Sequence, residues 1–67
     1  MKQEAFPMKL REIRISQNLT QAALAKRLKV SQPYVAQLES GVKPNPTLDM
    51  LRRLAKALKV TVVELVE

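Results

Sequence analysis

The sequence contains neither cysteine nor histidine, and it has one glycine among 67 residues. Without cysteine the chain forms no disulfide and no thiolate metal site. Without histidine it lacks the commonest general base and the commonest zinc ligand. A single glycine excludes a glycine-rich phosphate-binding loop. The six carboxylates are scattered, with no paired or metal-loop spacing: Glu4, Glu12, Glu39, Asp49, Glu64 and Glu67. We therefore expect no catalytic residues, no metal site, no cofactor and no enzymatic activity.

Long apolar runs are missing as well. No stretch is long enough to span a membrane, and the start of the chain shows no signal-peptide pattern. We therefore expect a cytoplasmic protein with no membrane partner. A chain of 67 residues corresponds to one domain, and a domain of this size buries only about 60% of its unfolded surface.

Positive charge is what the sequence has in excess. The net charge is +6 and the isoelectric point is about 10.2. A basic excess on a small domain favours a polyanionic partner such as nucleic acid. Charge alone is equally compatible with a protein that is merely soluble, so the order of residues has to decide between the two interpretations.

Residues 20–41 have the pattern of two short helices joined by a tight turn. Thr20 can cap a helix over residues 21–28, and Ser31 can cap a second helix over residues 32–40, because a hydroxyl oxygen accepts from an N–H that has no partner inside the helix. Only Lys29 and Val30 lie between the first helix and the second cap. So short a connection forces the two helices to cross steeply, which is typical of a helix-turn-helix.

The apolar residues of this stretch fall on one side of each expected helix. Leu24, Ala25 and Leu28 share a face of the first, and Val35 and Leu38 share a face of the second. The other face of the second helix is uncharged and largely capable of hydrogen bonding, and it carries Gln32, Pro33, Tyr34, Ala36 and Gln37.

This pattern resembles the phage repressor and Cro-like helix-turn-helix family, the XRE-type transcriptional regulators. The likeness rests on Gln21, Ala25, Val30, Val35, Leu38, Glu39 and Gly41, and it continues through LREIR and PTLDMLRRLAKALKV to cover residues 10–65. It implies an all-α fold, a compact five-helix lambda-repressor-like domain whose helices 2 and 3 form the helix-turn-helix. Lys29 and Lys59 depart from the family, which often has glycine there, and a left-handed lysine costs about 1 kcal/mol more than glycine.

The resemblance also implies the contacts with double-stranded DNA, since the second helix of such a motif enters the major groove. Glutamine can donate to and accept from adenine at the same time. Base contacts are expected from Gln32, Pro33, Tyr34, Ala36 and Gln37, and backbone contacts from Gln21, Ser31, Lys43 and Asn45. The alternatives are solvent-facing glutamines and an ordinary turn around Lys43 and Asn45.

Other positions of interest carry charge. By the resemblance, Arg14 of a first helix forms a structural ion pair with Glu39, the alternative being two solvated charges. Lys26, Arg27 and Lys29 either reach phosphates or form a solvated basic face. Four further cations are expected to be solvated on a later helix: Arg52, Arg53, Lys56 and Lys59.

Outside the motif, residues 1–5 are expected to be loose, and a helix is expected from Phe6-Pro7 to about Gln17, with Leu10 and Ile13 inward. Phe6 is either an apolar plug on that helix or a partner contact.

Thr47 should cap a helix with an inward stripe, and Thr61 with Glu64 should form a capping box that opens a last helix over residues 61–67. The stripe comprises Leu48, Leu51, Leu54, Ala55 and Leu58.

The last helix has more apolar residues than a small core can use. Leu65 or Val62 should face inward, which leaves Val63 and Val66 exposed at positions i and i+3. The resemblance implies a two-fold homodimer through this helix, with Val62, Val63 and Val66 at the interface. In the alternative, all four apolar residues pack within one chain.

The expected function is that of a dimeric transcriptional regulator, a repressor that reads a palindromic operator and is nucleoid-associated when bound. The alternative is an antitoxin or small adaptor that uses the valine-rich last helix on a different protein, such as a toxin.

Overall fold

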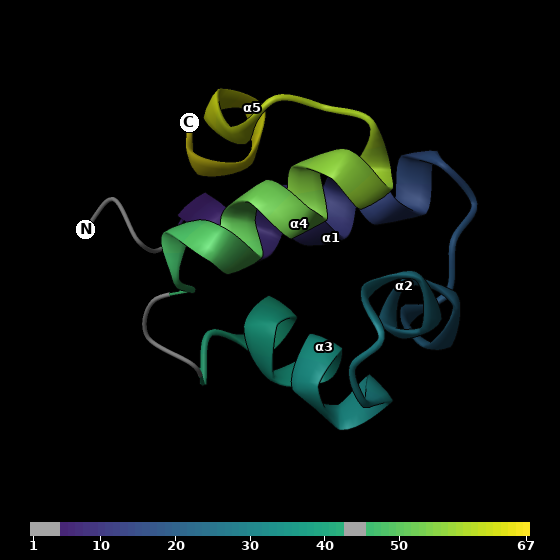
Figure 1. Ribbon diagram of the computed structural model, residues 1–67. Coiled ribbons are helices and arrows are strands. Elements are labelled where there is room, and N and C mark those ends of the chain that lie inside the picture. The colour runs from purple at the N-terminus through teal and green to yellow at the C-terminus, as the bar shows by residue number, and fades with distance from the viewer. Residues whose placement is uncertain (1–4, 43–45) are drawn as a thin grey trace.

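The computed structural model describes residues 5–42 and 46–67, and within them all regular structure is helical (Figure 1). The helices are α1 (Ala5–Ser16), α2 (Gln21–Leu28), α3 (Gln32–Ser40), α4 (Leu48–Leu58) and α5 (Val62–Val66). The predicted all-α, five-helix fold is confirmed, and α2 and α3 begin and end where the sequence places them. Ala5 was expected in a loose terminus and instead begins α1, which ends at Ser16 rather than at Gln17.

Each of the last four helices begins with a hydroxyl cap, as predicted. Thr20, Ser31, Thr47 and Thr61 have extended backbones, and each side chain accepts from the backbone N–H three residues later. Glu64 completes the capping box by accepting from the Thr61 N–H at 3.2 Å. These caps satisfy N–H groups that a helix cannot satisfy itself, and they set the boundaries of the helices.

Two helices end on a lysine in the left-handed conformation. Lys29 after α2 has φ 61° and Lys59 after α4 has φ 59°. The N–H of each lysine bonds back to carbonyl groups of its helix. A side chain with a Cβ crowds the backbone in this region, so each lysine is strained relative to glycine.

We expect Lys59→Gly to raise the free energy of unfolding by about 0.5–1 kcal/mol, because relief of the steric cost outweighs the greater freedom of unfolded glycine. Thermal melts followed by circular dichroism measure this effect. Lys56→Gly is the matched control: it removes the same side chain from a right-handed helical position and should lower stability by about 1 kcal/mol. Equal destabilisation by both changes would contradict the strain assigned to Lys59.

The core is made of apolar side chains from all five helices. Phe6 is 4% exposed, so it is the apolar plug rather than a partner contact. The predicted α4 stripe is wrong at its start: Leu48 is 55% exposed and Met50 is buried instead. Met50, Leu54 and Leu58 repeat every four residues, which puts Leu48 at the edge of their stripe. The buried apolar set is Phe6, Leu10, Leu24, Ala25, Leu28, Val35, Leu38, Met50, Leu54, Ala55, Leu58 and Leu65.

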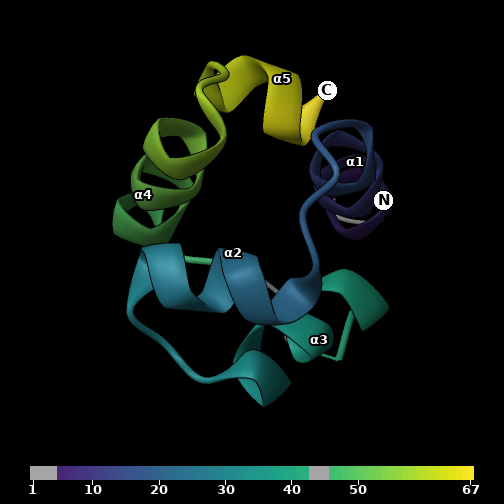
Figure 2. The same cartoon turned by 90° about the vertical axis from the view of Figure 1, so that its right-hand side faces the viewer.

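The helices surround this core as a ring. Figure 2 shows α2 between α3 on one side and α4 on the other, with α5 bridging α4 and α1. Helix α3 also packs against α1. Helix α3 therefore lies at one edge of the molecule and keeps one face directed away from the core. None of the helices described is both long and apolar enough to cross a bilayer.

Candidate nucleic-acid interface

Helix α3 has a buried face and an uncharged outer face. Val35 and Leu38, which are at most 1% exposed, hold it to the core. Gln32, Pro33 and Gln37 are exposed, as is the cap residue Ser31. The only charged residue in α3 is Glu39, so the outer face presents amide and apolar groups without charge.

Two of the predicted base-contact residues are less exposed than their neighbours. Ala36 is half-buried, and Tyr34 is half-buried because its side chain packs against the core. Of the predicted base-contact residues, the exposed ones are therefore Gln32, Pro33 and Gln37.

An ion pair ties α3 to α1. Arg14 Nε donates to Glu39 Oε2 at 2.6 Å, and Arg14 Nη2 donates to Glu39 Oε1 at 3.0 Å. The side chains of Arg14 and Glu39 are 10% and 4% exposed. Arg14 Nη1 also donates to the Leu19 carbonyl at 2.6 Å, in the connection that leads into α2. This bidentate pair fixes the end of α3 relative to α1 and to the start of the motif, and it excludes the alternative of two solvated charges.

Gln21 belongs to the same network. Its Nε2 donates to Glu39 Oε1 at 3.1 Å, and the side chain is half-buried at the first position of α2. A glutamine amide has two N–H groups and one carbonyl oxygen. One N–H directed to Glu39 orients the amide and leaves a second N–H and the oxygen as hydrogen-bonding groups at this edge of the motif.

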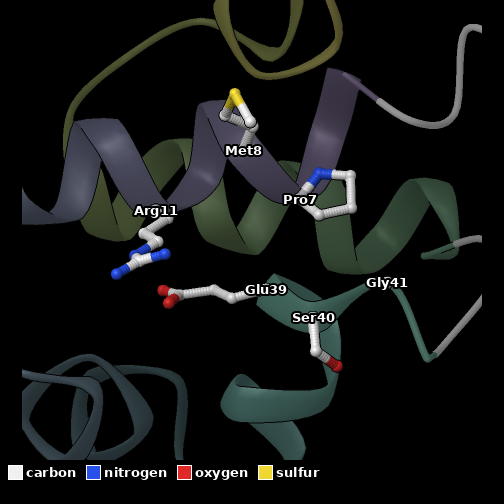
Figure 3. A pocket seen from close by; sticks show the side chains of 6 residues that line it. All are labelled: Pro7, Met8, Arg11, Glu39, Ser40 and Gly41. Atoms are coloured by element: carbon white, nitrogen blue, oxygen red, sulfur yellow. The ribbon is translucent and has the colours of Figure 1, made fainter.

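Arg11 is a functional candidate that the sequence analysis missed. A hollow of about 320 Å³ lies between the start of α1 and the end of α3 (Figure 3), and in that view the guanidinium of Arg11 points toward the carboxylate of Glu39. An adjoining hollow is lined by Arg11 together with Gln21, Ala36 and Ser40 among others. Arg11 is exposed and precedes Arg14 by three residues. Residues three apart share a helix face, so its spacing from Arg14 was the available signal.

The loop after α3 begins with Gly41 at φ 84°, the left-handed region that favours glycine. A Cβ at this position would meet Pro7 Cγ at 3.8 Å, so space is available and the backbone angle is what glycine satisfies. Lys43 and Asn45, two of the predicted backbone contacts, lie outside the described residues.

Arg27 and Arg53 are exposed, and each also makes a hydrogen bond to another helix that the sequence did not predict. Arg27 Nη1 donates to the Ala57 carbonyl at 3.0 Å, and Arg53 Nη2 donates to the Leu28 carbonyl. Arg27 of α2 thus binds a carbonyl group near the C-terminal end of α4, and Arg53 of α4 binds one at the C-terminal end of α2. Each positive charge complements the partial negative charge of that helix end. Sequence spacing did not reveal these contacts because α2 and α4 are distant along the chain.

The last helix directs its valines differently from expectation. Val63 is 58% exposed, as predicted, and Leu65 is fully buried. Val66 was expected to be exposed, yet it is half-buried and packs against the core, as Val62 does. Leu65 lies in the core and Val62 and Val66 pack against it, so among the four apolar residues only Val63 is exposed. The alternative that all four side chains pack within one chain is therefore wrong.

Comparison with known proteins places these features in a family. A family model described as helix-turn-helix matches residues 10–65. The chain is 40% identical over 60 residues to the HTH-type transcriptional activator BcrR of Enterococcus faecalis, covering 90% of this chain and 29% of BcrR. It is 37% identical over 59 residues to the HTH-type transcriptional regulator DdrOP3 of Deinococcus deserti, covering 88% of this chain and 45% of that protein. It therefore spans less than half the length of these relatives.

A solved structure supports the same grouping. The clp gene regulator ClgR from C. glutamicum superposes with a TM-score of 0.88 at 29% sequence identity. The alignment covers 97% of this chain and 83% of the ClgR chain.

Proposed function

Since this chain belongs to the helix-turn-helix family of transcriptional regulators, we propose that it represses transcription by binding a palindromic operator as a homodimer. Binding to double-stranded DNA follows from the family, which is typically non-enzymatic. The operator symmetry, the dimer and the repression are proposals that go beyond what the family implies. The proposed site of action is the nucleoid, in the cytoplasm.

The outer face of α3 carries this proposal. Gln32 and Gln37 are exposed on a helix whose opposite side is held by Val35 and Leu38. A rigid, uncharged ridge of this kind can lie in the major groove, where amide groups pair with base edges. In the proposed complex Gln32 and Gln37 read bases, Pro33 and Tyr34 contact a thymine methyl or the backbone, and Ala36 leaves room.

The sugar–phosphate backbone is contacted from both sides of that ridge. Gln21, oriented by Glu39, and Ser31, at the start of α3, donate from the motif. Lys43 and Asn45, which follow α3 in the sequence, are proposed to donate as well, and Arg11 adds a cation from α1. Such contacts fix the register of the protein on the duplex but carry no sequence information themselves.

The dimer contact is assigned to α5. Val63 is the exposed apolar residue of this helix, and Val62 and Val66 beside it are half-buried. A two-fold axis near α5 would place two α3 helices about 34 Å apart, which is one turn of B-DNA. An exposed valine at that axis is buried when the second copy binds.

The exposed Val63 also favours a second candidate function. The same surface would serve an antitoxin or adaptor that holds a different protein, such as a toxin. That function predicts a stable complex with the partner and no palindrome among bound duplexes. The two functions are compatible, because a protein-binding α5 leaves α3 available to DNA.

Selection of bound sequences from a random duplex pool tests the proposed function. We expect enrichment of a two-fold symmetric site whose half-sites lie about 10 base pairs apart. Placing that site in a promoter upstream of a reporter then distinguishes repression from activation, the role that the relative BcrR has by name. Failure to enrich any sequence would contradict the proposal.

Val63→Glu should give a folded monomer at sedimentation equilibrium, because a charge on each copy would face its twin at the two-fold axis. Folding should survive because glutamate is favourable in the first turn of a helix. Val42→Glu is the control: Val42 is 69% exposed and lies outside α5, so this variant should remain dimeric. A wild-type protein that is monomeric at about 500 μM would end the dimer proposal.

A further inference from the structure

The positive charge of this protein is concentrated away from α3. Seven of its twelve Lys and Arg residues lie in α2, α4 and the residue that follows each helix, while the sole carboxylate there is Asp49, in the first turn of α4. Those two segments therefore carry a net charge of +6, equal to that of the whole chain. Helix α3 has no cation. The seven residues are Lys26, Arg27, Lys29, Arg52, Arg53, Lys56 and Lys59.

Four of these cations surround one hollow. It measures about 390 Å³ and lies where the C-terminal ends of α2 and α4 meet, lined by Arg27, Leu28, Lys29, Arg53, Lys56 and Ala57. No carboxylate is among these lining residues. The hydrogen bonds from Arg27 to the Ala57 carbonyl and from Arg53 to the Leu28 carbonyl hold both guanidinium groups in place. The side chains thus pay little further ordering entropy when a ligand binds.

The residues that line the hollow come from the end of α2, from Lys29 after it and from α4, and none of them belongs to α3. Figure 2 shows α3 at one edge of the molecule and α4 on the opposite side of α2, and α2 packs against both. A straight duplex laid along the outer face of α3 need not cover a hollow to which α3 contributes no residue. The largest concentration of positive charge would remain available to a second partner in the DNA complex.

We propose that this hollow binds an acidic segment of another protein, one that carries an apolar side chain among its carboxylates. Arg27, Lys29, Arg53 and Lys56 would face the carboxylates, and Ala57, beside the buried Leu28, would meet the apolar side chain. A guanidinium fork matches a carboxylate with two parallel hydrogen bonds. The mixture of cations and an apolar floor fits such a segment better than it fits a duplex, whose backbone repeats phosphates and sugars and has no projecting apolar side chain.

The probe is a fluorescently labelled peptide of about ten residues with alternating Glu and Asp around one Leu. We expect saturable binding to the full chain by fluorescence anisotropy, and no binding of the same peptide with Gln and Asn in place of its acids. The selected operator duplex should bind to the peptide complex without releasing the peptide. Displacement by the duplex would show that the hollow belongs to the DNA surface, which overturns the proposal.

Matched double variants distinguish peptide binding in the hollow from attraction of the peptide by the protein's net positive charge. Lys29→Asn with Lys56→Gln removes two cations that line the hollow and should weaken peptide binding about tenfold. Lys59→Asn with Arg52→Gln also removes a left-handed lysine and an α4 cation, but neither residue lines the hollow. This variant should weaken peptide binding less than about threefold. Asn tolerates the left-handed position and Gln favours a helix, so both variants should fold.

Two further outcomes would overturn this proposal. One is equal weakening by the two double variants, which would assign the binding to net charge. The other is an absence of saturable peptide binding to the wild type at about 1 mM protein. Neither outcome depends on recognition of an operator, so the proposed DNA-binding function is tested separately by the random duplex pool.

Discussion

Glu39→Met should lower the free energy of unfolding by about 3–5 kcal/mol, because it leaves the guanidinium of Arg14 buried without its carboxylate. The Arg14 side chain is 10% exposed, so water cannot readily replace the lost partner. Gln21 loses the acceptor for its amide at the same time. A domain of 67 residues has a total stability of only about 3–10 kcal/mol, so this single change should remove a large part of it.

A double-mutant cycle separates the pair from its surroundings. Arg14→Met combined with Glu39→Met should cost less than the sum of the single changes, since neither charge then remains buried alone. Urea unfolding measures all three variants. Glu12→Met is the control, because Glu12 is an exposed carboxylate on the same helix as Arg14, and its loss should change stability by less than about 0.5 kcal/mol. If Glu39→Met were no more harmful than Glu12→Met, the ion pair would not be structural.

Gln32→Ala should change which sequence is bound. Gln32 is exposed at the first turn of α3, and alanine is the best helix former, so the fold should be retained. Loss of a glutamine–base contact should remove about 1–3 kcal/mol of discrimination at one position of each half-site. Competition among duplexes that each differ from the selected site by one base pair measures this profile.

Arg11→Ala and Lys43→Ala are the matched controls for that profile. Both residues are assigned to the backbone, so their loss should weaken all duplexes alike and leave the ranking of sequences unchanged. A Gln32→Ala profile that is parallel to the wild-type profile at every position would show that Gln32 does not read a base.

Local chemistry explains why the helix boundaries could be predicted from the sequence. Thr20, Ser31, Thr47 and Thr61 act on N–H groups three residues away, so the relevant partners are near in the chain. The pairing of Arg14 with Glu39 spans 25 residues, and it was predicted only because the family places an arginine and a glutamate at those positions.

The features that the sequence did not reveal are all set by packing between helices. Leu48 has the spacing of an inward residue, but the position of α4 against the core selects Met50. The sequence pattern of Arg27 and Arg53 is that of a solvated face, and their hydrogen bonds exist only because the C-terminal ends of α2 and α4 lie close together in the fold. Arg11 becomes a candidate contact only when α1 lies beside the end of α3. Spacing along one helix contains no information about which other helix will lie against it.

The most direct test of the central claim, that the uncharged outer face of α3 lies on the DNA, is a titration of ¹⁵N-labelled protein with the selected duplex. We expect the largest amide shifts at Gln32 and Gln37, at the start of α2 near Gln21, and at Arg11, with little change at the junction of α2 and α4. Shifts concentrated around Lys29 and Lys56, with the amides of α3 unmoved, would contradict the account and assign the duplex to the basic hollow.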